Sequence, residues 1–352
     1  MDLLVINIGG SSTKIALFNN KEMIKAHTIR HSVDELKLFK DIWDQYEFRK
    51  ASVLDYCKKN QIDIENLGAI VSRGPSVKPI KSGVYKISED MVRDAESNKY
   101  GTHPCGLGCK MAMEISNNRI LALTVDPPCV DEMIPAARYT GLPSIKRHSF
   151  FQALNHKAVA KRLAMQLDRK YEEMNIVVCH LGSGISVASH SFGRVIDVTN
   201  GLDGDAPFGL DRVGTLPAGD WMRFCLSGEH TRTDLERILN GGGGMMAHLG
   251  TNSAIEVEKM IKDGDKKAEE VYDAMAFNVI KGVGAASSIF GSKPDAIIFT
   301  GGLANSDYFI EKLKCKLSWI ANIFVFAGED EMLALAEGAL RALNNEEALI
   351  EY

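Results

Sequence analysis

The residues best suited to chemistry gather at the start of the chain, in a strand, a glycine turn and a second strand. An apolar run over 3–6 leads into a set of polar and glycine residues, namely Asn7, Gly9, Gly10, Ser11, Ser12 and Lys14. Glycine lets the backbone approach a ligand closely and adopt positive φ. Hydroxyl, amide and ammonium groups suit a polyanion, and the obvious candidate is a nucleoside triphosphate.

A similar arrangement occurs halfway along the chain. The apolar run 176–179 leads to four residues of the same kinds: His180, Gly182, Ser183 and Gly184. Placing Gly9 on Gly182 (182 − 9 = 173) also places Asn20 on Gly193 (193 − 20 = 173), without a gap. Equal internal spacing of two strand–turn–strand–turn–strand segments indicates a structural duplication and therefore two similar domains. Chance similarity of two glycine-rich hairpins is the alternative.

Polar or glycine residues also follow three further short apolar runs. Arg73 and Gly74 follow 69–71, Asp126 follows 120–125, and Gly301 and Gly302 follow 296–299. In open α/β sheets, ligands bind at the carboxyl ends of strands. A helix is expected over 146–167 and another over 332–342, with acidic residues at the start of the latter. The pattern predicts an α/β protein that holds a nucleotide between two domains.

Composition narrows the function classes. The chain has 352 residues and a net charge of −5, which gives no support for binding nucleic acid or an anionic membrane. No apolar stretch is long enough for a spanning helix, and the first residues do not resemble a secretion signal. Seven scattered cysteines are typical of reduced thiols, so we expect a cytoplasmic protein. The P-loop and Rossmann glycine patterns are absent, which disfavours both of those nucleotide-binding classes.

Several segments in order resemble the acetokinase family, within the larger group of actin-like, sugar-kinase-like and Hsp70-like ATPases. The segments are VINIGGSSTK, VSRGPSVKPIKSG, YGTHPCGLG, VDPPCVDEM, SFFQALNHKAVA, VCHLGSGISVASH, DGDAPFGLDRVGTLPAGD, GTNSAIEVEKM and FTGGLANS. Within the family, the chain is most similar to the butyrate and branched-chain carboxylate kinases. The resemblance implies two duplicated ribonuclease-H-like domains, 1–147 with 332–352 and 148–331, and an active-site cleft between them.

The implied reaction is reversible, Mg²⁺-dependent transfer of the ATP γ-phosphoryl group to a short carboxylate, giving an acyl phosphate and ADP. Arg73 matches the family arginine that pairs with the substrate carboxylate, and a guanidinium offers it two parallel donors. His103 matches a histidine near the phosphoryl group. Asp126 matches the catalytic aspartate, which can orient the substrate, bind Mg²⁺ or hold the arginine. No general base is required, because the substrate is already an anion.

The remaining implied roles concern metal and nucleotide. Asn7 and Glu331 would hold Mg²⁺, directly or through water, although Asn7 also suits a turn and Glu331 a helix start. The phosphate contacts would come from Ser11, Ser12, Lys14, His180, Gly182, Ser183 and Gly184. Lys14 alternatively points outward from its strand. The adenosine side would be lined by Gly301, Gly302 and Asn305.

Three positions depart from the family pattern. Gln152 replaces a histidine, for which His148 or His156 are candidate substitutes. Leu216 replaces an arginine, and Arg212 is the expected substitute cation. Ile255 stands where an arginine often stacks near adenine. Two alternatives therefore remain, a non-kinase actin-like ATPase and a catalytically impaired nucleotide-binding homologue. The resemblance also implies a homo-oligomer, at least a dimer.

Overall fold

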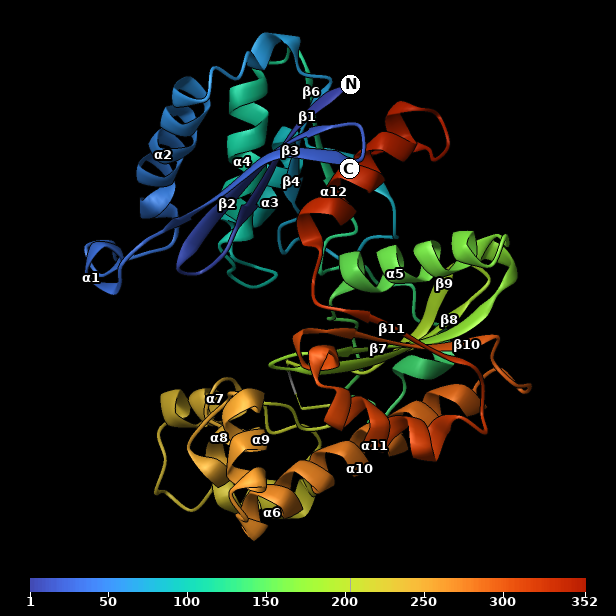
Figure 1. Cartoon of the computed structure of the whole chain (residues 1–352). Coiled ribbons are helices and arrows are strands. Elements are labelled where there is room, and N and C mark those ends of the chain that lie inside the picture. Colours follow the sequence, from blue (N-terminus) through green and yellow to red (C-terminus); the bar gives the residue numbers. More distant parts are fainter. Residues whose placement is uncertain (203) are drawn as a thin grey trace. The chain divides into compact units, whose positions relative to one another are not determined.

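The computed structural model describes residues 1–202 and 204–352, which form two compact units (Figure 1). Unit 1 comprises Met1–Val130 and Asp330–Tyr352, and unit 2 comprises Asp131–Glu329. The sequence-based limits differ at residues 131–147, which make their contacts in unit 2, and at 330–331, which belong to unit 1. Within that segment Ile134 donates its backbone N–H to the carbonyl of Ile196.

Unit 1 is built on a mixed sheet in the order β12-β5-β6-β4-β1-β2-β3. Its strands are β1 (Asp2–Ile8), β2 (Ser12–Asn19), β3 (Glu22–Arg30), β4 (Ala69–Arg73), β5 (Val84–Lys86), β6 (Leu121–Val125) and β12 (Leu349–Glu351). Its helices are α1 (Val33–Leu36), α2 (Tyr46–Lys59), α3 (Glu89–Glu96), α4 (Cys105–Ser116) and α12 (Glu331–Leu343). The apolar run at the start of the chain is thus the middle of a sheet.

The two faces of this sheet are covered by different helices. Ile6 pairs with Ser72, so the two share a face, and a Cβ on Gly108 of α4 would lie 2.4 Å from the Ser72 hydroxyl. Val125 pairs with Arg73 on the opposite face, where a Cβ on Gly338 of α12 would lie 2.4 Å from Val125. Helix α4 therefore covers one face, and α12 covers the face that carries Arg73.

Unit 2 is built on a sheet in the order β11-β10-β7-β8-β9. Its strands are β7 (Asn175–Leu181), β8 (Ile185–Ser191), β9 (Arg194–Val198), β10 (Ala296–Gly301) and β11 (Ile323–Ala327). Its helices are α5 (Ala153–Gln166), α6 (Ala218–Cys225), α7 (Arg232–Leu239), α8 (Gly244–Leu249), α9 (Ala254–Lys262), α10 (Lys266–Ser288) and α11 (Asp307–Leu317). Helix α5 packs on one face, through Val178 and Ile298, while α10 and α11 pack on the other (Figure 1).

The two sheets share one strand order. Three antiparallel strands, β1-β2-β3 or β7-β8-β9, are followed by two parallel strands beside the first, β4-β6 or β10-β11. In both units the middle antiparallel strand contains a register irregularity before its second turn. The expected α/β class with two similar domains is therefore confirmed.

One expected helix begins later than its sequence pattern suggests. Helix α5 starts at Ala153, although a helix was expected from Lys146. Lys146 forms an isolated bridge with Tyr139, and Arg147 binds the carboxylate of Asp197 at 2.8 Å. These contacts hold the segment before α5 as a loop, and residue spacing alone does not reveal them.

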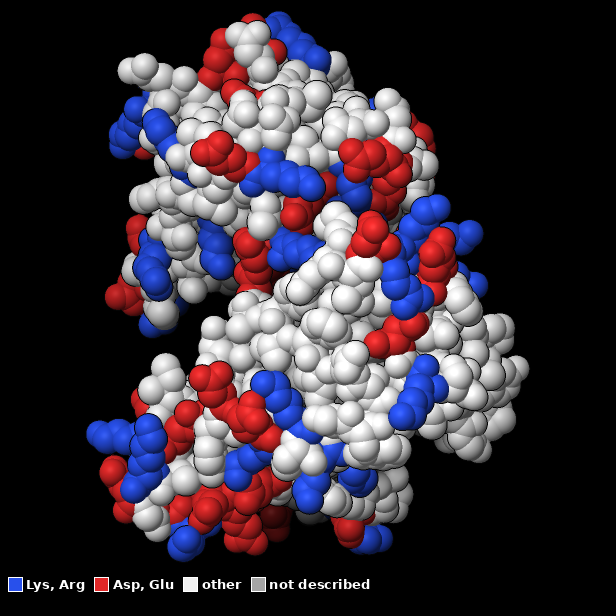
Figure 2. Space-filling view, turned by 45° about the vertical axis from the view of Figure 1, so that its right-hand side comes forward, with Lys and Arg blue, Asp and Glu red and all other residues white. Residues whose placement is uncertain are grey.

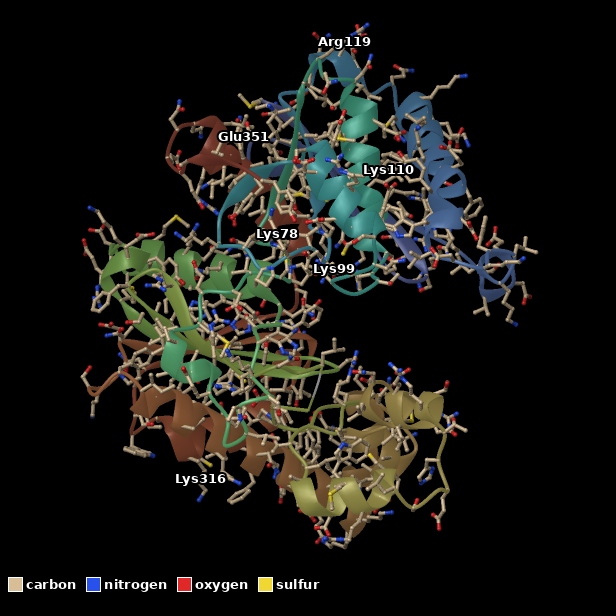
Figure 3. The ribbon with its side chains drawn as sticks, turned by 180° about the vertical axis from the view of Figure 1, so that it is seen from behind. Lys78, Lys99, Lys110, Arg119, Lys316 and Glu351 are labelled. Carbon is tan, nitrogen blue, oxygen red and sulfur yellow. The ribbon has the colours of Figure 1, made fainter. Side chains whose placement is uncertain are left out.

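The C-terminal tail returns to the unit 1 sheet as β12. Glu351 in β12 and Lys78, both labelled in Figure 3, belong to this region, and the Lys78 ammonium lies 4.0 Å from the ring centre of Tyr352.

On the face shown in Figure 2, acidic and basic side chains are interspersed. Among the described residues, no helix is long and apolar enough to cross a membrane.

Candidate active site

Three predicted residues meet at the strand ends of unit 1. The Arg73 guanidinium, at the end of β4, lies 3.0 Å from Glu331 Oε1, and the Asn7 side-chain amide donates to Glu331 Oε2 at 2.6 Å. Asn7 lies near the end of β1, and Glu331 is the first residue of α12. The N-terminus of a helix favours a carboxylate, so α12 holds Glu331 between the two strand ends. We call these three residues the Arg73 cluster.

Lys14 belongs to the same face of the sheet. It is paired directly with Asn7 across β1 and β2, and directly opposed residues point to the same side. The lysine is exposed, whereas Asn7 is buried. Lys14 thus adds a positive charge beside the Arg73 cluster.

Asp126 is held in an unusual backbone conformation immediately after β6. Its φ is +40°, a region costly for most residues that have a side chain. Its carboxylate accepts hydrogen bonds from the Ser82 hydroxyl at 2.6 Å and the Gly83 N–H at 2.8 Å. A Cβ on Gly74 would lie 2.2 Å from Pro127, so glycine is required there. The structure thus fixes the Asp126 side chain through Ser82 and Gly83, which end the family-like segment 71–83 but received no role in the sequence analysis.

His103 precedes α4 and is neutral at physiological pH. The N–H of Cys105 donates to its Nδ1 at 3.2 Å, so the neutral ring carries its proton on Nε2. Desolvation by the surrounding protein, and then the positive charge of Arg73, lower the pKa of His103 to about 4, although its surface still reaches solvent. His103 can therefore donate a hydrogen bond from Nε2 to an anion.

The phosphate turn expected in unit 1 lies between β1 and β2. Ser11 is exposed and Ser12 is half-buried. The Gly9 N–H donates to the Ser12 carbonyl at 2.8 Å, which closes the turn. Arg49 of α2 also contacts this turn, although the sequence analysis does not identify it as a functional residue.

The corresponding turn of unit 2 carries His180 at its base. His180 lies near the end of β7 and is almost fully buried, with Nδ1 3.1 Å from Asn155 Oδ1 and Nε2 3.0 Å from Glu329 Oε1. A Cβ on Gly182 would lie 3.1 Å from His180 Nε2, so the turn approaches this ring closely. Sequence reasoning missed Asn155 and Glu329, because both are distant from His180 in the chain.

Arg212 lies against the same turn. A Cβ on Gly184 would lie 3.3 Å from Arg212 Cγ, and the N–H of Asp211 reaches the Ser183 carbonyl at 3.4 Å. The guanidinium lies 3.2 Å from the Asp211 carboxylate and donates to Asn240. The structure thus brings Arg212 and the predicted glycine turn together.

The two candidate substitutes for the missing histidine have different surroundings in unit 2. His156 is fully buried, and its Nε2 lies 2.9 Å from the Ser186 hydroxyl. His148 lies 3.3 Å from the Asn200 side chain. Leu216 and Ile255 are both exposed.

The residues expected on the adenosine side form one short turn after β10. Gly301 has φ +90°, and a Cβ there would lie 2.4 Å from the Leu181 carbonyl, so only glycine fits. Gly302 has open space around it, and Asn305 donates to its carbonyl at 2.9 Å. This turn therefore packs directly on the strand that carries His180.

The Arg73 cluster fits Mg²⁺ by the chemistry of its donors. Mg²⁺ prefers oxygen and is usually held by one or two carboxylates, with waters and substrate phosphates completing its shell. Glu331 offers a carboxylate and Asn7 an amide oxygen. No group of three or more His, Cys, Asp or Glu suited to a metal occurs among the described residues. Glu331 and Asn7 together offer one carboxylate and one amide oxygen, so a Mg²⁺ held here would take its other ligands from phosphate and water.

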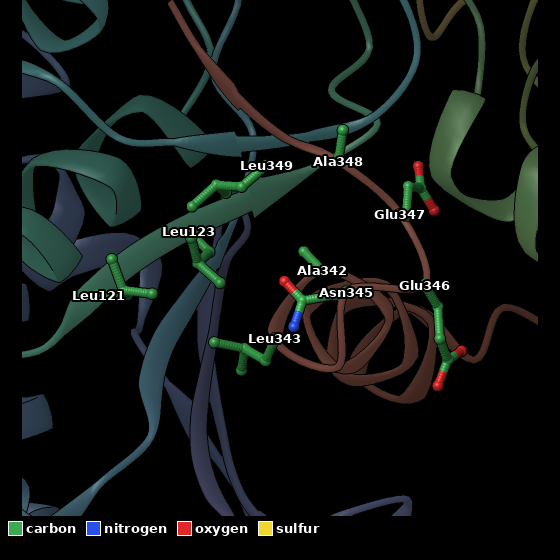
Figure 4. Close-up of a pocket in the computed structure, with 9 residues that line it drawn as sticks. All are labelled: Leu121, Leu123, Ala342, Leu343, Asn345, Glu346, Glu347, Ala348 and Leu349. Carbon is green, nitrogen blue, oxygen red and sulfur yellow. The ribbon is translucent and has the colours of Figure 1, made fainter.

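A pocket of about 480 Å³ lies elsewhere in unit 1 (Figure 4). Leu121, Leu343 and Leu349 line it, together with Glu346 and Glu347. Leu121 begins β6, whereas the catalytic candidate Asp126 follows its other end. Among the described residues that line this pocket, none belongs to the Arg73 cluster.

Comparison with known proteins shows the family and supports the fold. The model of the Acetokinase family matches residues 127–333, more than half of the chain. The fold is similar to acetate kinase from Porphyromonas gingivalis (TM-score 0.79, 18% identity, covering 96% of this chain and 99% of that one). It is also similar to propionate kinase from Francisella tularensis, with a TM-score of 0.77 and 21% identity, covering 96% of this chain and 98% of that one. For acetate kinase from Entamoeba histolytica, the TM-score is 0.77 and the identity 13%, covering 97% of this chain and 99% of that one. The match over 127–333 shows that this chain belongs to the acetokinase family.

Proposed function

We propose that this protein transfers the γ-phosphoryl group of ATP to a short-chain carboxylate, giving an acyl phosphate and ADP, and that the reaction is reversible. A carboxylate oxygen forms the new bond to phosphorus while the bond to the bridging oxygen of ADP breaks. Membership of the acetokinase family supports this reaction class. The observation that carries it is the Arg73 guanidinium, which already binds a carboxylate, that of Glu331, at the end of β4.

The chemistry needs positioning and charge neutralisation more than proton transfer. In this proposal Arg73 binds the substrate carboxylate, and neutral His103 donates from Nε2 to the transferring group. Asp126, whose carboxylate is fixed by Ser82 and Gly83, would orient the substrate, contact Mg²⁺ or hold Arg73. The carboxylate attacks as an anion, so none of these residues has to act as a base.

Asn7 and Glu331 would hold Mg²⁺, which neutralises phosphate charge during transfer when it is bound. In unit 2, His180 and the turn Gly182–Gly184 would bind nucleotide phosphate through backbone N–H groups. Arg212 would supply the cation that Leu216 lacks. Gly301, Gly302 and Asn305 would line the adenosine side.

The acid is proposed to be butyrate or a branched-chain acid, on the strength of the sequence resemblance. A hydroxamate assay with ATP, Mg²⁺ and linear and branched acids of two to six carbons tests both levels of the proposal. Acyl hydroxamate from any acid supports carboxylate kinase activity, and the highest kcat/KM identifies the acid. No hydroxamate with any acid would sink the proposal.

A cytoplasmic homo-oligomer completes the proposal. Sedimentation equilibrium measures the oligomeric state, and a monomer at all concentrations would contradict it.

A second candidate is a non-kinase ATPase or an impaired homologue, which the replacements Gln152, Leu216 and Ile255 favour. ATP hydrolysis independent of any acid would identify the former. Tight ATP binding without turnover would identify the latter.

A further inference from the structure

A buried arginine lies directly behind the first glycine turn. Arg49, on α2, has no exposed surface. Its Nε donates to the neutral Gln45 side chain at 3.0 Å. Among the ion pairs of the described residues none involves Arg49, so its charge has no carboxylate partner there. A buried charge without such a partner is costly, which calls for a reason at this position.

The guanidinium is directed at the carbonyl groups of the turn. Nη1 donates to the carbonyls of Gly9 at 2.9 Å and Ser12 at 3.2 Å, and Nη2 donates to that of Gly10 at 2.6 Å. The remaining carbonyl, that of Ser11, accepts the N–H of His31 at 2.9 Å. Every carbonyl of the turn is therefore held from within unit 1.

This arrangement sets the direction of the turn's amide groups. In a trans peptide the carbonyl of one residue and the N–H of the next point in opposite directions. The inward carbonyls of Gly9 and Gly10 therefore turn the N–H groups of Gly10 and Ser11 away from Arg49. In the described part of the chain neither of these two N–H groups donates to a protein acceptor.

We propose that Arg49 is a positioning residue that turns the Gly10 and Ser11 amides toward a phosphoryl anion and places a positive charge behind them. The ligand class is a polyphosphate, and the inference rests on the proposed nucleotide-dependent function. Successive outward N–H groups form an anion-binding concavity, and a guanidinium behind them favours negative charge in front. Arg49 itself does not touch the ligand.

Tripolyphosphate and adenosine separate this role from a general effect on folding. In Arg49→Met, we expect tripolyphosphate and ATP to bind at least about tenfold more weakly by calorimetry, since charged hydrogen bonds that orient the turn are lost. Adenosine affinity should stay within about twofold. Arg49→Lys keeps the charge but cannot bridge three carbonyls, so its loss should be intermediate. The matched control Gln45→Met removes an Arg49 partner outside the turn and should bind tripolyphosphate like the wild type.

The wild-type protein provides a test that does not depend on variant folding. Amide NMR during tripolyphosphate titration should shift the Gly10 and Ser11 signals more than those of neighbouring strands. Undisturbed signals at saturation, no tripolyphosphate binding, or equal losses for adenosine and tripolyphosphate in Arg49→Met would each overturn the inference. Tripolyphosphate binding with these shifts, but no acyl hydroxamate from any acid, would refute the carboxylate kinase activity and leave the role of Arg49 standing.

Discussion

At the scale of single residues, the proposed chemistry of unit 1 depends on which side chains the Glu331 carboxylate binds. It binds Arg73 through Oε1 and Asn7 through Oε2 at the same time, so removing Glu331 takes one contact away from each of them. Arg73 is the partner whose loss should affect substrate most directly. Its contact is of the charge-assisted kind, which is stronger than a neutral hydrogen bond.

Replacing Arg73 tests its proposed role. Arg73→Ala should lower kcat/KM for the carboxylate by roughly 30- to 1000-fold, equivalent to about 2–4 kcal/mol, because a bidentate charged contact is lost. Arg73→Lys should recover only part of the loss. Arg119→Ala is a matched control, since Arg119 is exposed and pairs with Glu65 (Figure 3). Wild-type kinetics in Arg73→Ala would remove the residue from the site.

His103 should titrate far below an ordinary histidine. Desolvation by the surrounding protein and the positive charge of Arg73 lower its pKa from 6.5 to about 4 in the folded state, so it stays mostly neutral until the pH approaches 4. The unfolded chain takes up this proton first, so stability should be lost as pH falls from 6.5 through 4. NMR of the ring carbons measures the titration directly. A His103 midpoint near 6.5 would show that the ring is not neutralised as described.

At the scale of elements, close packing of turns on strands determines where glycine is required. Gly74 and Gly301 each follow a central strand, and each has backbone or proline atoms where a Cβ would be. Both turns carry predicted ligand contacts. The requirement for glycine there is steric, whatever the ligand.

Two adjacent glycines allow this packing to be measured. Gly301→Ala should destabilise the protein by about 2 kcal/mol or more, because alanine at φ +90° is strained and its Cβ meets the Leu181 carbonyl. Gly302→Ala is the control, since no atom lies within 4 Å of its added Cβ. Thermal unfolding of both variants measures the difference. Equal midpoints would contradict the packing described for β10.

At the scale of the whole molecule, unit 1 is discontinuous in sequence. Helix α12 comes from the end of the chain and covers the face of the first sheet that carries Arg73. It buries apolar residues that include Leu335 and Ala339 and also places Glu331. The last residues of the chain thus belong to the same folded unit as the first residues.

Two truncations test this dependence. Removing 330–352 should prevent stable folding of unit 1, because α12 buries several apolar side chains. Burial of each of the larger ones, Leu335 and Leu340, contributes about 1.5–3 kcal/mol to the free energy of unfolding. Removing only 346–352 takes away β12 and part of the pocket in Figure 4 and should cost far less. Soluble yield and near-ultraviolet circular dichroism report the outcome. A native spectrum for the longer truncation would show that α12 is dispensable.

The sequence by itself determined the repeated strand–turn–strand–turn–strand segments, because glycine turns and apolar runs at equal spacing are local features that the chain carries in both halves. It also identified Asn7, Arg73 and Glu331 individually, through strand ends, a helix start and a family resemblance. Only the tertiary structure decided that these three bond to one another, since Glu331 is 324 positions from Asn7.

The same holds for the supporting residues. Ser82 and Asn155 lie in segments that resemble the family, yet neither they nor Glu329 received a role from the sequence, and only folding brings them to Asp126 or His180. Arg49 looked like one polar residue in a helix, yet packing removes it from water and leaves the carbonyls of a distant turn as its acceptors. Local patterns determine strands and turns, whereas pairing of buried polar groups depends on which distant atoms the fold places within hydrogen-bond reach.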